Sequence, residues 1–431
     1  MAGLATQSHT GPRAVGSLQG VVGWLAARPH RAFLVIFSIS FSLGLALLPF
    51  VPPIALVPHT RWEVEAVAVS LARFGTFADP YALPTGPTAH MPPAYPFFLS
   101  LIYRAFGLTP VAGYVAWLLR IAVSSAMVAM LPWLSRRLGT GTEAGVIGGI
   151  AGELVPRWPS QVEAPAAIVL GLLLVAFLGR WKRDRNSARA SFLLGVAWGA
   201  AFHLSVSLLA VLAGCMLFEL WWSADRRKWA WSFLIALGVV LACLPWTWRN
   251  RVALGDVFFM RSNLGLELRM GNHDGALPDV DRTDVVEGGA QLHPRTNLAE
   301  ARLVQELGER EYMRRAGRQA LEWIGQHPTT FLGLTARRAA CFWFGSTFDP
   351  ARMLAGALLT LLAVLGARRA VPALNAPQRA AFLVPLAAYP LVYYLVVFTS
   401  RYSEPLNGLL LVLAGAGIWR STTGTSRGES G

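Results

Sequence analysis

Acidic and imidazole side chains gather in the polar stretch that follows the first long apolar run of this 431-residue chain. Glu63, Glu65, Asp79 and His90 all lie within it. A carboxylate that is ionised at neutral pH can accept a proton from a nucleophile, so the three acids are candidates for a general base. We favour Glu63 and keep Glu65 and Asp79 as alternatives.

The preference for Glu63 depends on the helix that is expected to begin here. Thr60 and Glu63 have the spacing of a capping box, in which each side chain bonds the backbone amide of the other residue. Helical periodicity places Glu63 beside an apolar face and turns Glu65 toward water. That face consists of Val64, Val67, Leu71 and Phe74. Capping alone would also explain Glu63, so its role as a base is a hypothesis.

Arginines stand at two further places beside apolar runs. Arg249 and Arg251 directly follow the tryptophans at the end of one run, and Arg401 lies beside Tyr402 in a short turn near the C-terminus. A guanidinium group can hold a phosphate through two parallel hydrogen bonds, which makes these arginines candidates for phosphate binding. Snorkelling toward lipid headgroups is the alternative explanation for Arg251 and Arg401.

Arg120 lies inside an apolar run, where an arginine at the bilayer centre costs about 3 kcal/mol. It should therefore face protein or a polar cavity. We count it among the candidates for substrate binding, together with His90, Tyr95 and Tyr402. A hydrogen-bonded loop histidine with no chemical role is the simpler interpretation of His90.

The composition identifies the class of protein. Hydrophobic residues make up 54% of the chain and charged residues only 14%, which is too little charge to cover a soluble globule of this size. We therefore expect an all-α polytopic membrane protein with about ten transmembrane helices. The cysteines, Cys215, Cys243 and Cys341, have no disulfide or zinc-site spacing, and we predict no metal ion and no cofactor.

The short basic loops agree on one orientation. With the N-terminus in the cytoplasm, the arginine- and lysine-rich turns near residues 136, 180, 226 and 368 all lie inside, as the positive-inside rule expects. Membrane topology thus explains the net charge of +14 without nucleic acid. The expected spans are residues 32–57, 110–134, 143–155, 162–178, 190–205, 206–222, 230–246, 353–365, 380–398 and 406–418.

The same orientation places three polar regions, residues 60–107, 249–349 and 399–405, on one outer face. In the first we expect a surface helix, a stiff proline-rich loop and a second surface helix; in the second, a helix capped by Asn297 and an interfacial helix over 330–344. The expected organisation is a cytoplasmic tail (1–31), a transmembrane bundle (32–248) with an outer loop (58–109), an extracytoplasmic helical region (249–350), C-terminal transmembrane helices (351–420) and a cytoplasmic tail (421–431).

Five short stretches carry a family resemblance. They are TGPTA and PPAYPFFLSLIYRAFG in the first polar region, PWTWRN at the end of a run, SNLGLELRMGN, and RYSEP in the last turn. In this order they resemble the GT-C class membrane glycosyltransferases of family 39, and most of all the bacterial relatives of aminoarabinose transferase and protein O-mannosyltransferase. Such enzymes usually carry an Asp-Glu pair just after the first span, where this chain has Pro58 and His59.

The resemblance implies inverting transfer of a sugar from a polyprenyl-phosphate donor to a lipid, glycan or protein acceptor. The reaction would take place on the outer face of a bacterial cytoplasmic membrane, with the lipid bilayer as a further partner. One alternative is a non-catalytic protein of the same fold that binds the lipid carrier or serves envelope assembly. Another is a secondary transporter, which should show inverted repeats and helices broken at mid-membrane; neither is visible in the sequence.

Overall fold

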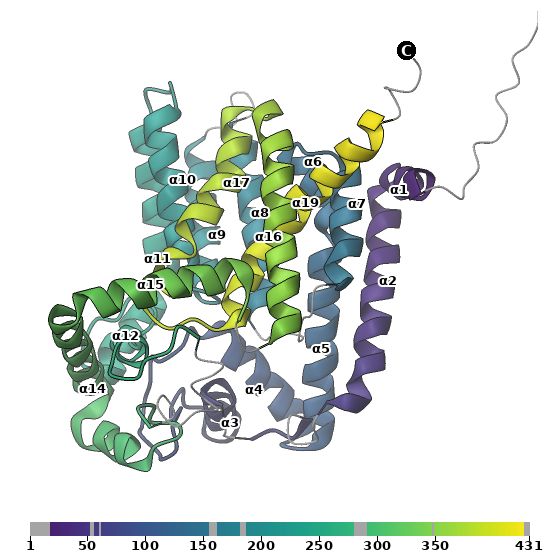
Figure 1. Cartoon of the computed structure of the whole chain (residues 1–431). Coiled ribbons are helices and arrows are strands. Elements are labelled where there is room, and N and C mark those ends of the chain that lie inside the picture. Colours follow the sequence, from purple (N-terminus) through teal and green to yellow (C-terminus); the bar gives the residue numbers. More distant parts are fainter. Residues whose placement is uncertain are drawn as a thin grey trace, which may run out of the picture.

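The chain forms an all-α polytopic membrane protein, as expected (Figure 1). The computed structural model describes residues 18–51, 56–59, 62–154, 162–181, 187–279, 291–346 and 349–425, with side chains as far as residue 419. Within these ranges there is no strand beyond an isolated bridge between Ala78 and Pro87. Five stretches in the described part are long and apolar enough to cross a membrane: Pro29–Phe50, Pro110–Leu138, Glu163–Arg180, Lys228–Leu254 and Pro350–Ala373.

A bundle of roughly parallel helices forms the upper part of Figure 1. Each expected span overlaps a helix of this bundle, but the ends differ: α2 stops ten residues before the predicted end at 57, and α11 and α19 continue eight and seven residues beyond 246 and 418. The helices of the bundle are α2 (Pro29–Leu47), α5 (Pro110–Ala129), α6 (Leu131–Leu138), α7 (Thr142–Ala151), α8 (Glu163–Arg180), α9 (Ala188–Phe202), α10 (Leu208–Trp222), α11 (Lys228–Leu254), α16 (Pro350–Ala370), α17 (Ala376–Ala388) and α19 (Glu404–Thr425).

Two further predicted boundaries are wrong. The span expected over 380–398 is broken, because α17 ends at Ala388 and the short helix α18 (Leu391–Leu395) starts after Pro390. Proline has no amide hydrogen to continue the helix, and the apolar composition of the run conceals this break in the sequence. The region 1–31 is not simply a tail, since it contains helix α1 (Leu18–Ala26), whose Val22 and Leu25 side chains are buried.

Glycines let the bundle helices approach closely. A Cβ atom on Gly195 of α9 would lie 2.1 Å from the Ile235 carbonyl oxygen of α11, and one on Gly238 of α11 would lie 2.4 Å from the Phe192 carbonyl oxygen. Small residues at helix crossings are typical of membrane bundles, where dispersion contacts between backbones drive association. Backbone contacts of this kind therefore fix α9 against α11.

A second group of helices covers one end of the bundle, at the lower part of Figure 1. It comprises α3 (Glu63–Phe74), α4 (Ala94–Phe106), α12 (Leu264–Gly271), α14 (Leu298–Gln326) and α15 (Pro328–Phe344). The predicted order of surface helix, loop and surface helix is confirmed by α3 and α4. The predicted cap is confirmed as well, because the Asn297 side chain accepts hydrogen bonds from the first amides of α14.

Candidate functional site

A cavity of about 410 Å³ lies where these covering helices meet the bundle. Its walls come from α3, α4, α8, α12, the segments before α10 and α14, and the chain between α17 and α19. All three polar regions of the sequence thus contribute to one cavity, so the prediction that they share one end of the molecule is confirmed. The charged groups of the lining are Glu63, Glu163, Glu267, Arg261, Arg295 and Arg401.

The predicted site residues divide into two sets. Glu63, His90, Tyr95, Arg401 and Tyr402 line the cavity. The other three, Arg120, Arg249 and Arg251, are not part of its lining, and each has a hydrogen-bond partner elsewhere.

Glu63 is the first residue of α3, and the capping box expected for it is wrong. The residue that precedes the helix is Trp62, which has an extended backbone and makes no side-chain cap. Thr60, the expected cap, lies outside the described residues. The Glu63 carboxylate accepts a hydrogen bond from its own backbone amide, and its position at the helix N-terminus favours the charged form.

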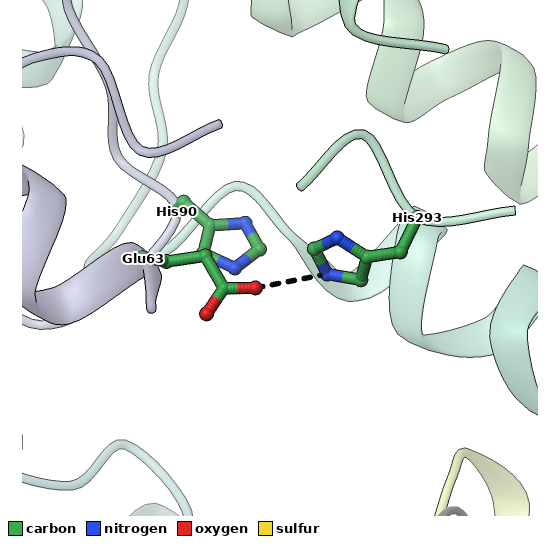
Figure 2. A group of neighbouring side chains, drawn as sticks. All are labelled: Glu63, His90 and His293. Atoms are coloured by element: carbon green, nitrogen blue, oxygen red, sulfur yellow. Dashed lines mark ion pairs between the residues drawn. The ribbon is translucent and has the colours of Figure 1, made fainter. Parts of the chain in front are cut away.

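Two basic side chains approach the Glu63 carboxylate, and Figure 2 shows one of them, His293. His293 Nε2 lies 3.3 Å and Arg295 Nε 3.2 Å from Glu63 Oε1. Arg295 also stacks over the ring of Trp62, with its guanidinium carbon 4.4 Å from the ring centre. Burial by itself raises the pKa of the Glu63 carboxyl, but His293, His90 and Arg295 more than offset this effect and lower it below its ordinary value. Glu63 is thus ionised at neutral pH.

His90 completes a cluster with Glu63 and His293. Its Nδ1 lies 2.9 Å from the Tyr81 hydroxyl, and burial lowers the pKa of the ring to about 3, so the imidazole is neutral. The ligand atoms of Glu63, His90 and His293 all lie within 4.8 Å of one another, a spacing that could hold a metal ion. Sequence analysis predicted no metal site because the three residues are far apart along the chain.

The helical period predicted that Glu65 points toward water, and this prediction is wrong. The Glu65 side chain is buried, with His59 Nδ1 at 3.0 Å and Arg120 Nη2 at 3.6 Å. Burial raises the pKa of the Glu65 carboxyl to about 7, although Arg120 opposes the shift. The reason is that seven consecutive α3 residues, 65–71, are buried, so the helix is covered on all sides rather than on one face.

Arg120 faces protein, as expected for an arginine inside a span. Its Nε donates a hydrogen bond of 2.8 Å to the Tyr95 hydroxyl, and it approaches the ring of Trp117 to 5.5 Å. Tyr95 itself lines the cavity. Arg120 therefore orients a residue of the cavity wall from behind.

Arg249 and Arg251 are engaged with backbone. Arg249 donates hydrogen bonds of 2.5 and 2.7 Å to the carbonyl oxygens of Thr88 and Phe77, and Arg251 donates to the Gly255 carbonyl at 2.9 Å. The first of these contacts holds the loop between α3 and α4 against the end of α11. The hydrogen bonds of Arg249 are thus to the backbone of this loop, and its predicted phosphate contact stays a prediction.

The opposite wall of the cavity combines a charged pair with stacked tyrosines. Arg401 Nε lies 3.5 Å from Glu163 Oε1, and the Arg401 side chain is 56% exposed. Tyr402 stacks on Tyr393 with ring centres 4.5 Å apart, and the Tyr393 and Ser207 hydroxyls are 2.6 Å apart. Glu163 was not among the predicted site residues, although an acid at the start of a long apolar helix is a signal that could have identified it.

Comparison with known proteins found one distant structural likeness. No protein-family model matches the chain, and no curated protein matches it. Among solved structures, the chain is similar to the crystal structure of ArnT from Cupriavidus metallidurans bound to undecaprenyl phosphate. The sequence identity is 14%, the match covers 94% of this chain and 79% of that chain, and the TM-score is 0.40. A likeness this distant carries no argument about activity.

Proposed function

We propose that this chain is a membrane glycosyltransferase that moves a sugar from a polyprenyl-phosphate donor to a lipid, glycan or protein acceptor. The main support is the cavity in which an ionised carboxylate, Glu63, and a guanidinium, Arg401, are brought together at the end of a transmembrane bundle. A cavity at the edge of the bilayer suits a donor whose isoprenoid chain stays in the lipid while its phosphate and sugar enter the protein.

The proposed reaction in this cavity is a single displacement at the anomeric carbon of the donor sugar. The acceptor oxygen attacks that carbon while its bond to the phosphate oxygen breaks, and the configuration inverts. We propose that Glu63 accepts the proton of the acceptor, since it is ionised at neutral pH. A phosphate leaves without needing a general acid, and its charge is stabilised by guanidinium groups.

Arg401 is the best placed of the predicted arginines for the phosphate. It is partly exposed within the cavity lining, and Glu163 at 3.5 Å orients it without closing it off. His90, Tyr95 and Tyr402 remain candidates for binding the sugar or the acceptor, because all three line the same cavity. Arg120 would act only through Tyr95, to which it is hydrogen-bonded.

A second function has one observation in its favour. Because cationic neighbours lower the pKa of Glu63, they also make it a weaker base. A non-catalytic protein that binds the lipid carrier would need the same arginines and no base at all. The two functions therefore differ in whether sugar is transferred, and agree in the binding of a polyprenyl phosphate.

The experiment that separates them measures transfer from a labelled polyprenyl-phosphate sugar in membranes that contain the protein. Glu63→Gln should reduce turnover by roughly 10²-fold or more, because glutamine keeps the shape but cannot accept the proton. Glu322→Gln, at an exposed position on α14, is the matched control and should retain wild-type turnover. Wild-type turnover in Glu63→Gln would remove this residue as the base, and donor binding with no transfer by the wild type would support the carrier-binding function.

A further inference from the structure

Three side chains with ligand atoms meet on the cavity wall from separate parts of the chain (Figure 2). Glu63 begins α3, His90 lies in the loop before α4, and His293 lies in the segment before α14. Each offers one ligand atom, and these atoms lie within 4.8 Å of one another. We propose that the three residues bind a divalent transition-metal ion of the zinc class, a role that does not depend on the proposed sugar transfer.

The distances suit neighbouring ligands of one ion. His293 Nε2 lies 3.3 Å from Glu63 Oε1, whereas charge-assisted N–H···O hydrogen bonds are usually about 2.7–2.9 Å long. Zinc bonds of about 2.0–2.1 Å at tetrahedral angles place adjacent ligand atoms roughly 3.4 Å apart. His293 Nε2 and Glu63 Oε1 already have this separation. A small movement of the His90 ligand atom toward them would complete the site.

The hydrogen bonds around the two imidazoles set their ligand atoms. His90 Nδ1 is engaged by the Tyr81 hydroxyl at 2.9 Å, which leaves Nε2 to bind the ion. When Nδ1 donates its proton to the tyrosine oxygen, the ring has the outer hydrogen bond that orients most metal-bound histidines. His293 Nδ1 accepts the Arg295 amide at 3.1 Å, which places the ring proton on Nε2; an ion on Nε2 therefore moves this proton to Nδ1 and breaks the contact with the amide.

Arg295 does not prevent binding at Glu63. A carboxylate oxygen has more than one lone pair, so Oε1 can bind an ion and still keep its ion pair with Arg295, whose Nε lies 3.2 Å away.

The chemistry of the donors selects the ion. Two imidazole nitrogens and one carboxylate favour zinc, cobalt or nickel, while magnesium and calcium prefer sites made of oxygen. Three protein ligands leave a fourth tetrahedral position to a water or an anionic oxygen. Because all three residues line the cavity, that position faces the space in which a phosphate or an acceptor would lie.

The test measures metal binding directly on the full-length protein in detergent, purified through an affinity tag without histidine and stripped with a chelator. Cobalt titration should give one equivalent per chain with the absorption of a tetrahedral complex. Zinc, measured by competition with a coloured chelator, should displace it, and a large excess of magnesium should not. His90→Ala and His293→Ala should each weaken zinc binding by roughly tenfold or more, with thermal unfolding of the metal-free protein near that of the wild type.

Two further variants serve as a control and as an independent test of the metal site. His30→Ala removes an exposed histidine of α2 and should leave binding unchanged. Tyr81→Phe keeps the buried ring but removes the hydroxyl on His90, so it should fold and still weaken binding. No stoichiometric binding by the wild type, or unchanged affinity in His293→Ala and Tyr81→Phe, would overturn the site. Since no transfer assay is involved, an inactive protein that binds zinc would count against the proposed function alone.

Discussion

The acidic residues Glu63 and Glu65 on α3 meet opposite electrostatic environments. Histidine and arginine neighbours lower the pKa of Glu63 despite its burial, whereas burial raises the pKa of Glu65 to about 7 because a single arginine does not compensate it. The first carboxylate lines the cavity and keeps its charge. The second lies behind the cavity wall, between His59 and Arg120.

Glu65 should make folding stability depend on pH. A carboxyl with a pKa of about 7 in the folded protein and an ordinary value of 4.5 binds its proton more tightly when folded, so its stability penalty is complete above about pH 7 and absent below about pH 4.5. Glu65→Gln removes that penalty. The melting temperature of the variant relative to wild type should therefore be higher at about pH 8 than at about pH 5.

Thermal unfolding in detergent at both pH values measures this difference. The cost of leaving Arg120 without its carboxylate partner lowers the stability of the variant at every pH, so only the change with pH is informative. The exposed Glu322→Gln variant should show no such change. An equal difference at both pH values would mean that Glu65 stays ionised in the folded protein.

The sequence predicted these two residues unequally, for a physical reason. The period of α3 identifies which residues share a face. It does not reveal how many neighbours cover the helix, so the burial of Glu65 was missed. His293 was missed because only the tertiary fold brings it to Glu63.

The loop between α3 and α4 is the element that carries His90 into the cavity. Inside the loop, Asp79 adopts a positive φ of 59° and accepts a hydrogen bond of 2.8 Å from the Gly86 amide. From outside, Glu309 of α14 accepts from the Ala89 amide at 2.8 Å and from the Thr88 hydroxyl. These contacts agree with the stiff loop that its prolines predict, and with Asp79 as a turn residue.

Arg249 and Arg401 should respond differently to the same substitution. In Arg249→Lys the two hydrogen bonds to the Thr88 and Phe77 carbonyls cannot both form, so stability should fall by roughly 1–2 kcal/mol. In Arg401→Lys the planar fork is lost from the cavity, so affinity for the polyprenyl-phosphate donor should fall about tenfold with little change in stability.

Donor binding and thermal unfolding, measured on both variants, form a matched pair. The sequence alone predicted a phosphate contact for both arginines, because both follow or flank a span on the same side. A larger loss of donor affinity in Arg249→Lys than in Arg401→Lys would restore that earlier interpretation. It would also show that the contacts of Arg249 with the loop are less important than its charge.

At the scale of the whole molecule, the basic residues of the short loops and the cavity lie at opposite ends of the bundle. Basic residues stand near the ends of several bundle helices, and the upper ends of this bundle in Figure 1 lie away from α3. They are Arg136 of α6, Arg180 of α8, Lys228 of α11 and Arg368 of α16. The cavity lies at the other end of the same helices. Helix α11 alone has 27 residues, which at 1.5 Å per residue gives a length of roughly 40 Å, enough to cross a bilayer.

This separation predicts the orientation in the membrane. Short loops rich in arginine and lysine remain on the cytoplasmic side, so the cavity should open on the outer face. The native cysteines, Cys215, Cys243 and Cys341, are buried thiols, so they should react slowly with a membrane-impermeant thiol reagent. Single cysteines placed at exposed positions 227 and 322 then report the two ends of the molecule. In intact cells the reagent should label residue 322 and spare residue 227, and permeabilised cells should label both. Labelling of both residues in intact cells would contradict a bundle that spans the membrane between them, and labelling of residue 227 alone would place the cavity in the cytoplasm, where the proposed transfer on the outer face could not occur.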